Sequence, residues 1–418
     1  MTYRISAIAA LALMGGATAA LAASVNSTDN VFQAAQAANS EQLNLLSEIV
    51  NIDSGTGDVD GGRKIAAIMI PKLKALGASI EIVPAELLGL PENVVATFEG
   101  TGKGRVLMIG HMDTVFESGT AKERPYRVEG THARGPGVAD EKGGVVEGFY
   151  AIKLIHDLGF KDFRRITFLI ETSEEKGSPG TRQLIKRLLA DADVELNLEP
   201  GDPPDTLTVW RKGSVTFHID VKGKAAHAGV NPQDGHNAAL ELVHQIAGLK
   251  VFPQWGPGIT VNLTILRAGE RNNIIPDAAS AQVNARVLKP EQVDQIERVL
   301  RRNAEHVVVP GTSVTVTSEP AFPPLPRNAD TDALAARAKG FYQDIGKDIQ
   351  MGGNGGASQS ALAAEAGVPA LDGLGPVGGG FHSDREYADL ETVTPRLYLL
   401  TKLIMSLGSD PIKRADKH

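Results

Sequence analysis

Apolar runs and amphipathic segments alternate along the first half of the chain. Some short runs are apolar and rich in β-branched residues, as buried strands are: 93–99, 105–110, 165–171 and 193–198. A further strand pattern lies at 79–83, and helical spacing of apolar residues predicts helices over 39–50, 60–76, 145–158 and 181–190. Because strands that alternate with helices form parallel sheets covered on both faces, this half predicts an α/β domain.

Near residue 210 the pattern changes to longer alternating strands. The predicted order is a strand at 214–222, a helix at 237–248, strands at 259–266 and 281–288, a helix at 290–306 and a strand at 313–317. This β-α-β-β-α-β order is that of a ferredoxin-like sandwich. The proline-rich segment 319–326 predicts a return linker, and helices follow at 330–341, 358–366 and 395–407. We therefore expect a discontinuous α/β domain, 24–210 and 325–418, with an α+β insertion, 211–324.

The first residues have the pattern of a targeting segment. Arg4 is followed by an apolar stretch, 5–20, and by a small-x-small signal at Ala20-Leu21-Ala22. This order predicts a secretory signal peptide over 1–22, and with it a secreted, periplasmic protein. The alternative is a membrane anchor. No later stretch is long and apolar enough to span a bilayer, so we expect no membrane partner.

Composition narrows the chemistry. The 418 residues carry 42 Lys and Arg against 50 Asp and Glu, a net charge of −8, so no basic surplus attracts nucleic acid. The chain contains no cysteine, which excludes disulfides, thiolate catalysis and cysteine-ligated metals. Any metal ligands must therefore be His, Asp or Glu.

Two adjacent glutamates, Glu174 and Glu175, follow the strand predicted at 165–171. Ligands bind at the carboxyl ends of strands in open α/β sheets, and side chains just past a strand escape its alternation. One carboxylate can then bind a metal while the other holds a proton. The alternative is a solvated acidic turn, which explains most isolated Glu-Glu pairs.

Other strand ends and tight loops complete a set of five candidate ligands: His111, Asp140, Glu175, Glu199 and His382. Two divalent metals about 3.5–4 Å apart need a bridging carboxylate and further ligands on each side, and this residue set suits zinc. Each residue alone has an ordinary explanation, such as a capped strand end or a loop position. The glycine-rich loop 135–144 is not a phosphate loop, because it lacks the G-x-x-x-x-G-K-[ST] spacing and carries an acidic pair.

Seven segments taken together resemble the M20 family of co-catalytic zinc peptidases, most closely its glutamate carboxypeptidases of the carboxypeptidase G type. The resemblance spans nearly all of the chain after the predicted signal peptide. The matching segments are 111–115 (HMDTV), 135–144 (GPGVADEKGG), 174–178 (EEKGS), 198–200 (LEP), 223–229 (GKAAHAG), 272–276 (NNIIP) and 381–383 (FHS).

The resemblance implies a ligand arrangement. His111 and Glu199 would hold one zinc ion, Glu175 and His382 the other, and Asp140 would bridge the two. Two Zn²⁺ per chain are expected, with Co²⁺ or Mn²⁺ as alternatives. The implied fold is a zinc-peptidase α/β catalytic domain with an inserted ferredoxin-like lid and dimerisation domain.

Further roles follow from the same resemblance. Asp113 would orient His111, as metal-bound histidines generally require. Glu174 would be the general base, and the peptide bond after Asp140 would be cis.

The lid residues carry the implied substrate contacts. His227 would stabilise the oxyanion from the other subunit of a homodimer. Arg286 and Asn273 would hold the substrate carboxylate, with Gly356 beside them, because the guanidinium fork matches two carboxylate oxygens. The alternatives are a structural loop histidine for His227 and an exposed strand position for Arg286.

The chain departs from its relatives at two positions. Gln359 stands where many relatives have Asp, and Glu141 where Asp is frequent. Both departures leave the metal ligands intact, and the first bears on substrate preference.

We expect a di-zinc exopeptidase that removes a C-terminal amino acid, with glutamate the leading candidate, from a small peptide or an N-acyl or folate-like conjugate. The nearest alternative is a dipeptidase or an aminoacylase-type amidohydrolase on the same fold. A different class of protein, a metal-bound solute-binding protein without turnover, would have no need for a general base such as Glu174.

Overall fold

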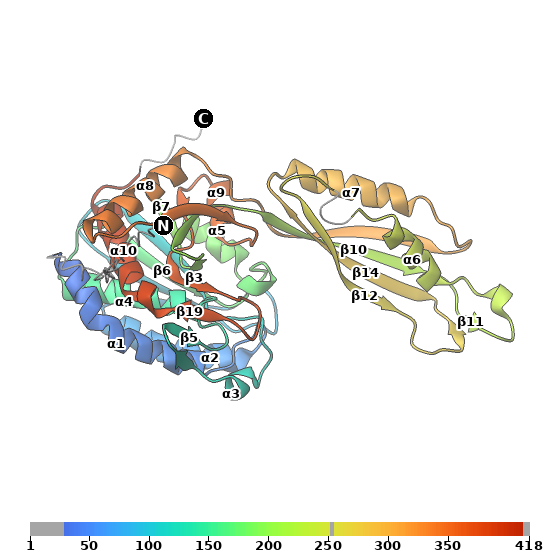
Figure 1. Ribbon diagram of the computed structural model, residues 1–418, viewed down its shortest axis with the longest axis horizontal. Helices are drawn as coiled ribbons and strands as arrows, with labels where there is room; N and C mark the ends of the chain where they lie inside the picture. Colours follow the sequence, from blue (N-terminus) through green and yellow to red (C-terminus); the bar gives the residue numbers. More distant parts are fainter. Residues whose placement is uncertain (1–28, 251–254, 413–418) are drawn as a thin grey trace, which may run out of the picture.

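The computed structural model describes residues 29–250 and 255–412, which form two lobes (Figure 1). The larger lobe holds both ends of the described chain, and the smaller lobe extends from it on long strands. The predicted signal peptide, 1–22, lies outside the described residues. None of the helices in this part of the chain is both long and apolar enough to cross a membrane.

The larger lobe is built on a mixed sheet of six strands within the described residues. In spatial order the strands are β1 (Ser79–Val83), β2 (Asn93–Glu99), β6 (Arg165–Glu171), β3 (Arg105–His111), β7 (Val194–Asn197) and β17 (Ala370–Leu371). Strands β6, β3, β7 and β17 are parallel, whereas β1 and β2 pair antiparallel at one edge. The predicted parallel sheet is thus wrong at that edge, where β2 runs antiparallel to both β1 and β6 and the short 84–92 connection places it beside β1.

Helices cover both faces of this sheet, as the sequence predicts. The residues of β3 alternate between the two faces, so Val106 and Met108 enter one apolar core while Leu107 and Ile109 enter the other. The larger lobe's helices are α1 (Asn30–Val50), α2 (Val59–Ala75), α3 (Thr120–Glu123), α4 (Lys142–Asp157), α5 (Arg182–Ala190), α8 (Ala329–Asp344), α9 (Ser360–Glu365) and α10 (Leu390–Ser409).

Short strands complete this lobe. One sheet orders β4 (Arg127–Glu129), β5 (His132–Arg134), β19 (Tyr387–Asp389), β18 (Gly375–Gly379) and β8 (Pro200–Gly201), and β9 (Thr206–Arg211) pairs with β16 (Gln350–Asn354). Residues 352–354, which are rich in glycine, form the end of β16. They form a strand because they pair with β9, a contact that the local sequence does not indicate.

The smaller lobe, the lid, is a four-stranded antiparallel sheet in the order β12-β14-β10-β15 with α6 and α7 on one face (Figure 1). This is the predicted ferredoxin-like arrangement. The elements are β10 (Gly213–Lys222), α6 (Ala238–Ala247), β12 (Thr260–Ala268), β14 (Ala278–Val287), α7 (Glu291–Ala304) and β15 (Ser313–Phe322), with β11 (Ala226–His227), η2 (Pro232–Asp234) and β13 (Ile274–Ile275) beyond the sheet. Strand β15 continues through half of the segment predicted as a linker, because the strand keeps its pairing with β10 there.

Candidate active site

The carboxyl ends of three adjacent parallel strands bring the strand-end candidates together. His111 ends β3, which lies between β6 and β7 in the sheet. Glu174 and Glu175 begin the 3-10 helix η1 (Glu174–Lys176) just after β6, and Glu199 follows β7. Because parallel strands end at the same edge of a sheet, these side chains share one site.

Two loops add the remaining ligands. Asp140 precedes α4, and its peptide bond to Glu141 is cis, as the family resemblance implies. His382 lies in the turn between β18 and β19 with φ +59°, a conformation that residues with a side chain seldom adopt. Both loops reach the sheet edge where the strand-end residues meet.

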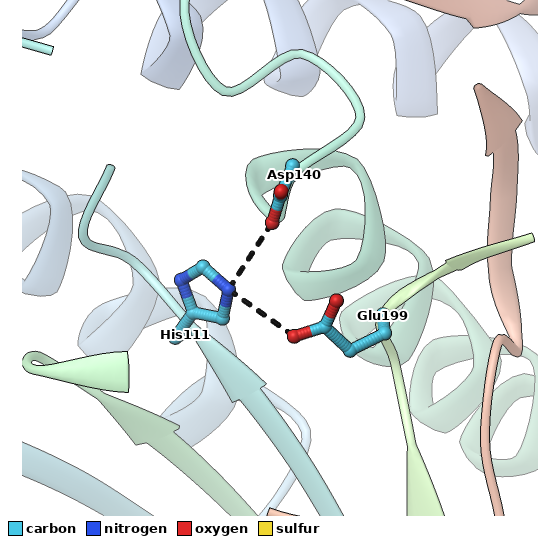
Figure 2. Close-up of side chains that lie close together, drawn as sticks. All are labelled: His111, Asp140 and Glu199. Atoms are coloured by element: carbon cyan, nitrogen blue, oxygen red, sulfur yellow. Dashed lines mark ion pairs between the residues drawn. The ribbon is translucent and has the colours of Figure 1, made fainter. Parts of the chain in front are cut away.

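Among the described residues the ligand atoms fall into two groups that share Asp140. Figure 2 shows the first: His111 Nε2 lies 3.4 Å from Asp140 Oδ1 and 3.6 Å from Glu199 Oε1. In the second group, His382 Nε2 lies 3.3 Å from Asp140 Oδ2 and 3.2 Å from Glu175 Oε2. The two oxygens of Asp140 thus face different histidines, as a bridging carboxylate requires.

The tautomer of His111 fits a metal ligand. Its Nδ1 lies 2.9 Å from the backbone oxygen of Asp113, and a carbonyl oxygen can only accept, so Nδ1 carries the proton. Its Nε2 is therefore the nitrogen left to bind a cation, and it faces the carboxylates. Within the described chain this fully buried atom has no hydrogen-bond partner. A cation between Nε2 and the carboxylates would satisfy both.

The electrostatics of the site point the same way. Burial, and then the charge of Glu199, raise the pKa of Glu174 well above its usual value. Burial and Asp140 raise the pKa of Glu175 to about 7. Hydrogen bonds to Asp140 and Glu175 raise the pKa of His382 to about 10. Several carboxylates are buried together here, and the positive groups nearby do not balance their negative charge. Divalent cations would supply the missing positive charge.

Buried residues behind the site hold its loops. Glu386 accepts hydrogen bonds from the backbone N–H groups of Gly137 (3.1 Å), Ala139 (3.0 Å) and Asp140 (3.1 Å). Sequence reasoning missed Glu386. The only local signal is an acidic residue four positions after His382, and nothing in its spacing indicates burial.

Arg211 is a second residue that sequence reasoning missed. Its buried guanidinium makes two hydrogen bonds to the carboxylate of Asp372, at 2.8 and 2.5 Å, and lies 3.6 Å from Glu199 Oε2. The hydroxyls of Ser358 and Ser360 also donate to Asp372. The signal available in the sequence was an arginine at the end of an apolar strand, 206–211, where a buried charge needs a partner.

A cleft of about 290 Å³ opens from the candidate metal centre toward the lid. On the side of the larger lobe it is lined by Glu174, Arg211, Gly356 and His382, and on the lid side by residues of β10 and β14 that include Arg286. Arg286 is half-buried, and its Nε donates to Asn284 Oδ1 at 3.1 Å. The structure thus places two of the predicted substrate residues, Arg286 and Gly356, at the cleft.

The other lid candidates lie elsewhere in this chain. His227 pairs with Ile274 across β11 and β13, and the N–H of Ala228 donates to the backbone oxygen of Asn273. Figure 1 shows β11 at the end of the lid farthest from the larger lobe. Neither His227 nor Asn273 lines the cleft in the described part of the chain.

The two departures from the relatives are both buried. Glu141 Oε2 accepts a hydrogen bond from the backbone N–H of His111 at 3.1 Å and lies 3.3 Å from its Nε2. Gln359 is fully buried between Glu171 and Asn197, behind the cleft. The Gln359 side chain faces the protein interior and is inaccessible to a substrate, so any effect of this departure on substrate preference would be indirect, and that effect stays a prediction.

Comparison with known proteins agrees with this geometry. Residues 107–406 match the family described as Peptidase family M20/M25/M40. Carboxypeptidase G2 of Pseudomonas sp. (strain RS-16) is 33% identical over 409 residues, 97% of each chain. The di-peptidase Dug1p of Saccharomyces cerevisiae superposes with a TM-score of 0.74 at 15% identity, covering 93% of this chain and 100% of its own. The Bacillus subtilis YXEP protein, a dinuclear metal binding peptidase, gives 0.64 at 16% identity, covering 89% and 99%.

Proposed function

The chain belongs to peptidase family M20/M25/M40 and is a hydrolase of that family, and from this premise we propose that it is a di-zinc carboxypeptidase. It removes a C-terminal amino acid, glutamate before others, from small peptides or N-acyl and folate-like conjugates. The observation that carries the proposal is Asp140, whose two oxygens serve two ligand groups beside Glu174. The preference for glutamate rests on the similarity to carboxypeptidase G2.

The residues present fit the metal pair. His111 and Glu199 would hold one ion, Glu175 and His382 the other, and Asp140 would contribute to both. His and carboxylate ligands without cysteine suit Zn²⁺, and Co²⁺ or Mn²⁺ could take the same places. When bound, the metal pair lowers the pKa of water and polarises the scissile carbonyl.

Glu174 moves the proton. Its carboxylate is buried at the cleft, with Oε2 3.9 Å from His111 Nε2, and it is not a member of either ligand group. It accepts a proton from the attacking water and delivers it to the leaving nitrogen as the amide bond breaks. Because Glu174 is buried, little water surrounds its carboxylate, which strengthens its charge interactions.

Arg286 holds the α-carboxylate of the substrate, and the backbone of Gly356 borders the same space. Because Arg286 extends from β14 at the base of the lid, it reaches the cleft from its own chain. A fork of N–H donors matches the two carboxylate oxygens.

His227 and Asn273 reach the cleft of the partner chain in a homodimer. This part of the proposal is supported by the lid edge. In the described part of the chain β12 pairs with β14 alone, and its Leu263, Ile265 and Leu266 side chains are exposed. Helix α6, which packs on β10 and β14, exposes Leu240 and Val243. An unpaired strand edge and an exposed apolar helix face on the same lobe are suited to pair with a symmetry copy.

The proposed location is the periplasm, on the evidence of residues 1–22 alone. A dipeptidase or aminoacylase-type amidohydrolase is the second candidate, since Dug1p shares the fold. One panel separates the candidates: N-acyl-glutamates, folate-like conjugates, dipeptides and N-acetyl amino acids, each assayed with Zn²⁺. Cleavage of dipeptides with free amino termini, and of no N-blocked substrate, would contradict the carboxypeptidase assignment.

A further inference from the structure

Gln359 makes two hydrogen bonds that join separate strands. It precedes α9 and is fully buried. Its Nε2 donates to Glu171 Oε1 at 2.6 Å, and its Oε1 accepts from Asn197 Nδ2 at 2.9 Å. Glu171 is the last residue of β6 and Asn197 the last of β7. Strand β3, which ends in His111, lies between them, so the amide of Gln359 spans the strand that carries a metal ligand.

Each end of this link continues to a ligand loop. Glu171 Oε1 also accepts from Ser178 Oγ at 2.7 Å, and the N–H of Ser178 closes the turn around η1 by donating to the backbone oxygen of Ser173 at 2.9 Å. At the other end, Asn197 Oδ1 accepts from the backbone N–H of Glu199 at 3.1 Å. One chain of hydrogen bonds therefore runs from the loop of Glu174 and Glu175 to Glu199.

We propose that Gln359 is a positioning residue that fixes the distance between these two ligand loops. The inference rests on the proposed metal centre and adds a residue that touches neither metal nor substrate. An amide is the group required here, because it donates to Glu171 and accepts from Asn197 at the same time. A carboxylate in its place can accept from Asn197 but leaves Glu171 without a donor at that side.

The sharpest test exchanges the two groups. Gln359→Glu removes the hydrogen bond to Glu171, and it places two carboxyl groups side by side where they repel each other. The double variant Glu171→Gln with Gln359→Glu restores one donor and one acceptor between the two side chains. The chain of hydrogen bonds can then form again with the Ser178 hydroxyl, which contacts the same oxygen of Glu171, accepting where it donated before. Because partners behind metal ligands typically change metal affinity by about 10–100-fold, we expect Gln359→Glu to lose Zn²⁺ to a chelator about 10-fold or more readily, and the double variant to recover.

Gln245→Glu is the matched control. Gln245 is a buried amide in the lid, and its Nε2 donates to Glu241 Oε1 at 2.7 Å, so the substitution makes the same carboxylate pair away from the cleft. We expect it to lower the melting temperature of metal-free and Zn²⁺-loaded protein alike. In Gln359→Glu, by contrast, the rise in melting temperature on adding Zn²⁺ should shrink, and kcat should fall more than KM rises.

Three outcomes would overturn the inference. The Gln359→Glu variant could show the same rise in melting temperature on adding Zn²⁺, and the same Zn²⁺ retention, as wild type. That result would show that the residue only packs the interior. Failure of the double variant to recover Zn²⁺ retention would show the same, and this variant decides the matter if the single one does not fold. Wild-type protein that takes up no Zn²⁺ would overturn the proposed function as well, so the two failures are distinguishable.

Discussion

Oδ1 of Asp113 accepts a hydrogen bond from the backbone N–H of Glu174 at 3.1 Å. Its Oδ2 accepts from the N–H of Glu175 at 3.3 Å and from Thr56 Oγ1 at 2.7 Å. The short contact to His111 Nδ1 comes instead from the Asp113 backbone oxygen, at 2.9 Å, with the carboxylate oxygen 3.5 Å away. Asp113 thus holds His111 with its backbone and the loop of Glu174 and Glu175 with its side chain.

Replacing Asp113 by Asn should therefore disturb the loop of Glu174 and Glu175 and leave the backbone contact to His111 in place. The amide presents one acceptor where the carboxylate presents two, so one of the two N–H groups at Glu174 and Glu175 loses its partner. We expect Zn²⁺ affinity to fall by about 10–100-fold, as is typical of residues behind metal ligands, and kcat to fall with it. Competition with a metal-sensitive dye measures the affinity. Thr56→Val, which removes a single donor to the same carboxylate, should have a smaller effect, and equal effects would contradict the assignment.

Glu174→Gln should abolish turnover while sparing the metal centre. The amide has nearly the same shape but cannot accept the water's proton, and general-base catalysis contributes about 10²–10⁴-fold. Metal content, melting temperature and KM should stay near wild type. Glu117→Gln, at an exposed position, is the control for loss of a negative charge. A Glu174→Gln variant with a tenth or more of wild-type kcat would exclude the general-base role.

The sequence predicted the candidate ligands because the ends of buried strands can be recognised from the local pattern of apolar residues. The run 165–171 is apolar and β-branched, so the position of Glu175 just beyond it follows from the local pattern. The same holds for His111 after 105–110. The apolar spacing predicts a helix start at 39, nine residues after α1 begins, because the cap at Asp29, which accepts from the N–H of Val31, precedes the periodic pattern.

The roles of the residues behind the site could not be predicted from local patterns. The role of Gln359 depends on Glu171 and Asn197, which lie more than 160 positions away in the chain, and no local period encodes such a contact. Glu386 supports the loop of Asp140 from a similar distance. The short strands β4, β5 and β19 have three residues each, too few for alternation to register.

Removing single ligands should separate the two metal positions. Wild type should hold about two Zn²⁺ per chain and lose activity on chelation. His382 belongs to one group only, so His382→Ala should reduce the content to about one ion, whereas Asp140→Ala removes the shared ligand and should reduce it further. Metal analysis after gel filtration gives the stoichiometry. His156→Ala, on the exposed side of α4, is a control for loss of a histidine. Full activity of metal-free wild type would refute the metal centre.

Arg286→Ala should lower kcat/KM for substrates with a free α-carboxylate. Leaving a partly buried carboxylate without its charged partner typically costs about 2–5 kcal/mol, which should appear in kcat/KM. The loss should shrink when that carboxylate is amidated, since wild type then lacks the pair as well. Free and amidated substrate on both proteins form a double-mutant-style cycle. Arg302→Ala, at an exposed position of α7, is the control, and a coupling energy near zero would favour a general amidohydrolase.

The position of His227 leads to a test of the dimer. In one chain it lies at the far end of the lid, so it can serve only a neighbouring chain's cleft if it serves one at all. Glu174→Gln and His227→Ala should each be nearly inactive as homodimers. A mixed dimer, however, has one complete site: the cleft of the His227→Ala chain, completed by His227 of the Glu174→Gln chain.

Unfolding and refolding the two variants together should therefore restore activity that neither has alone. Random pairing of equal amounts gives mixed dimers in about half of the assemblies, each with one working site of two, so about a quarter of wild-type activity is the upper bound. Glu174→Gln mixed with Asp140→Ala is the control, because both defects lie in the cleft and no arrangement completes a site. If the first mixture recovers no more activity than this control, His227 does not act across a dimer, and its role reverts to that of a lid residue.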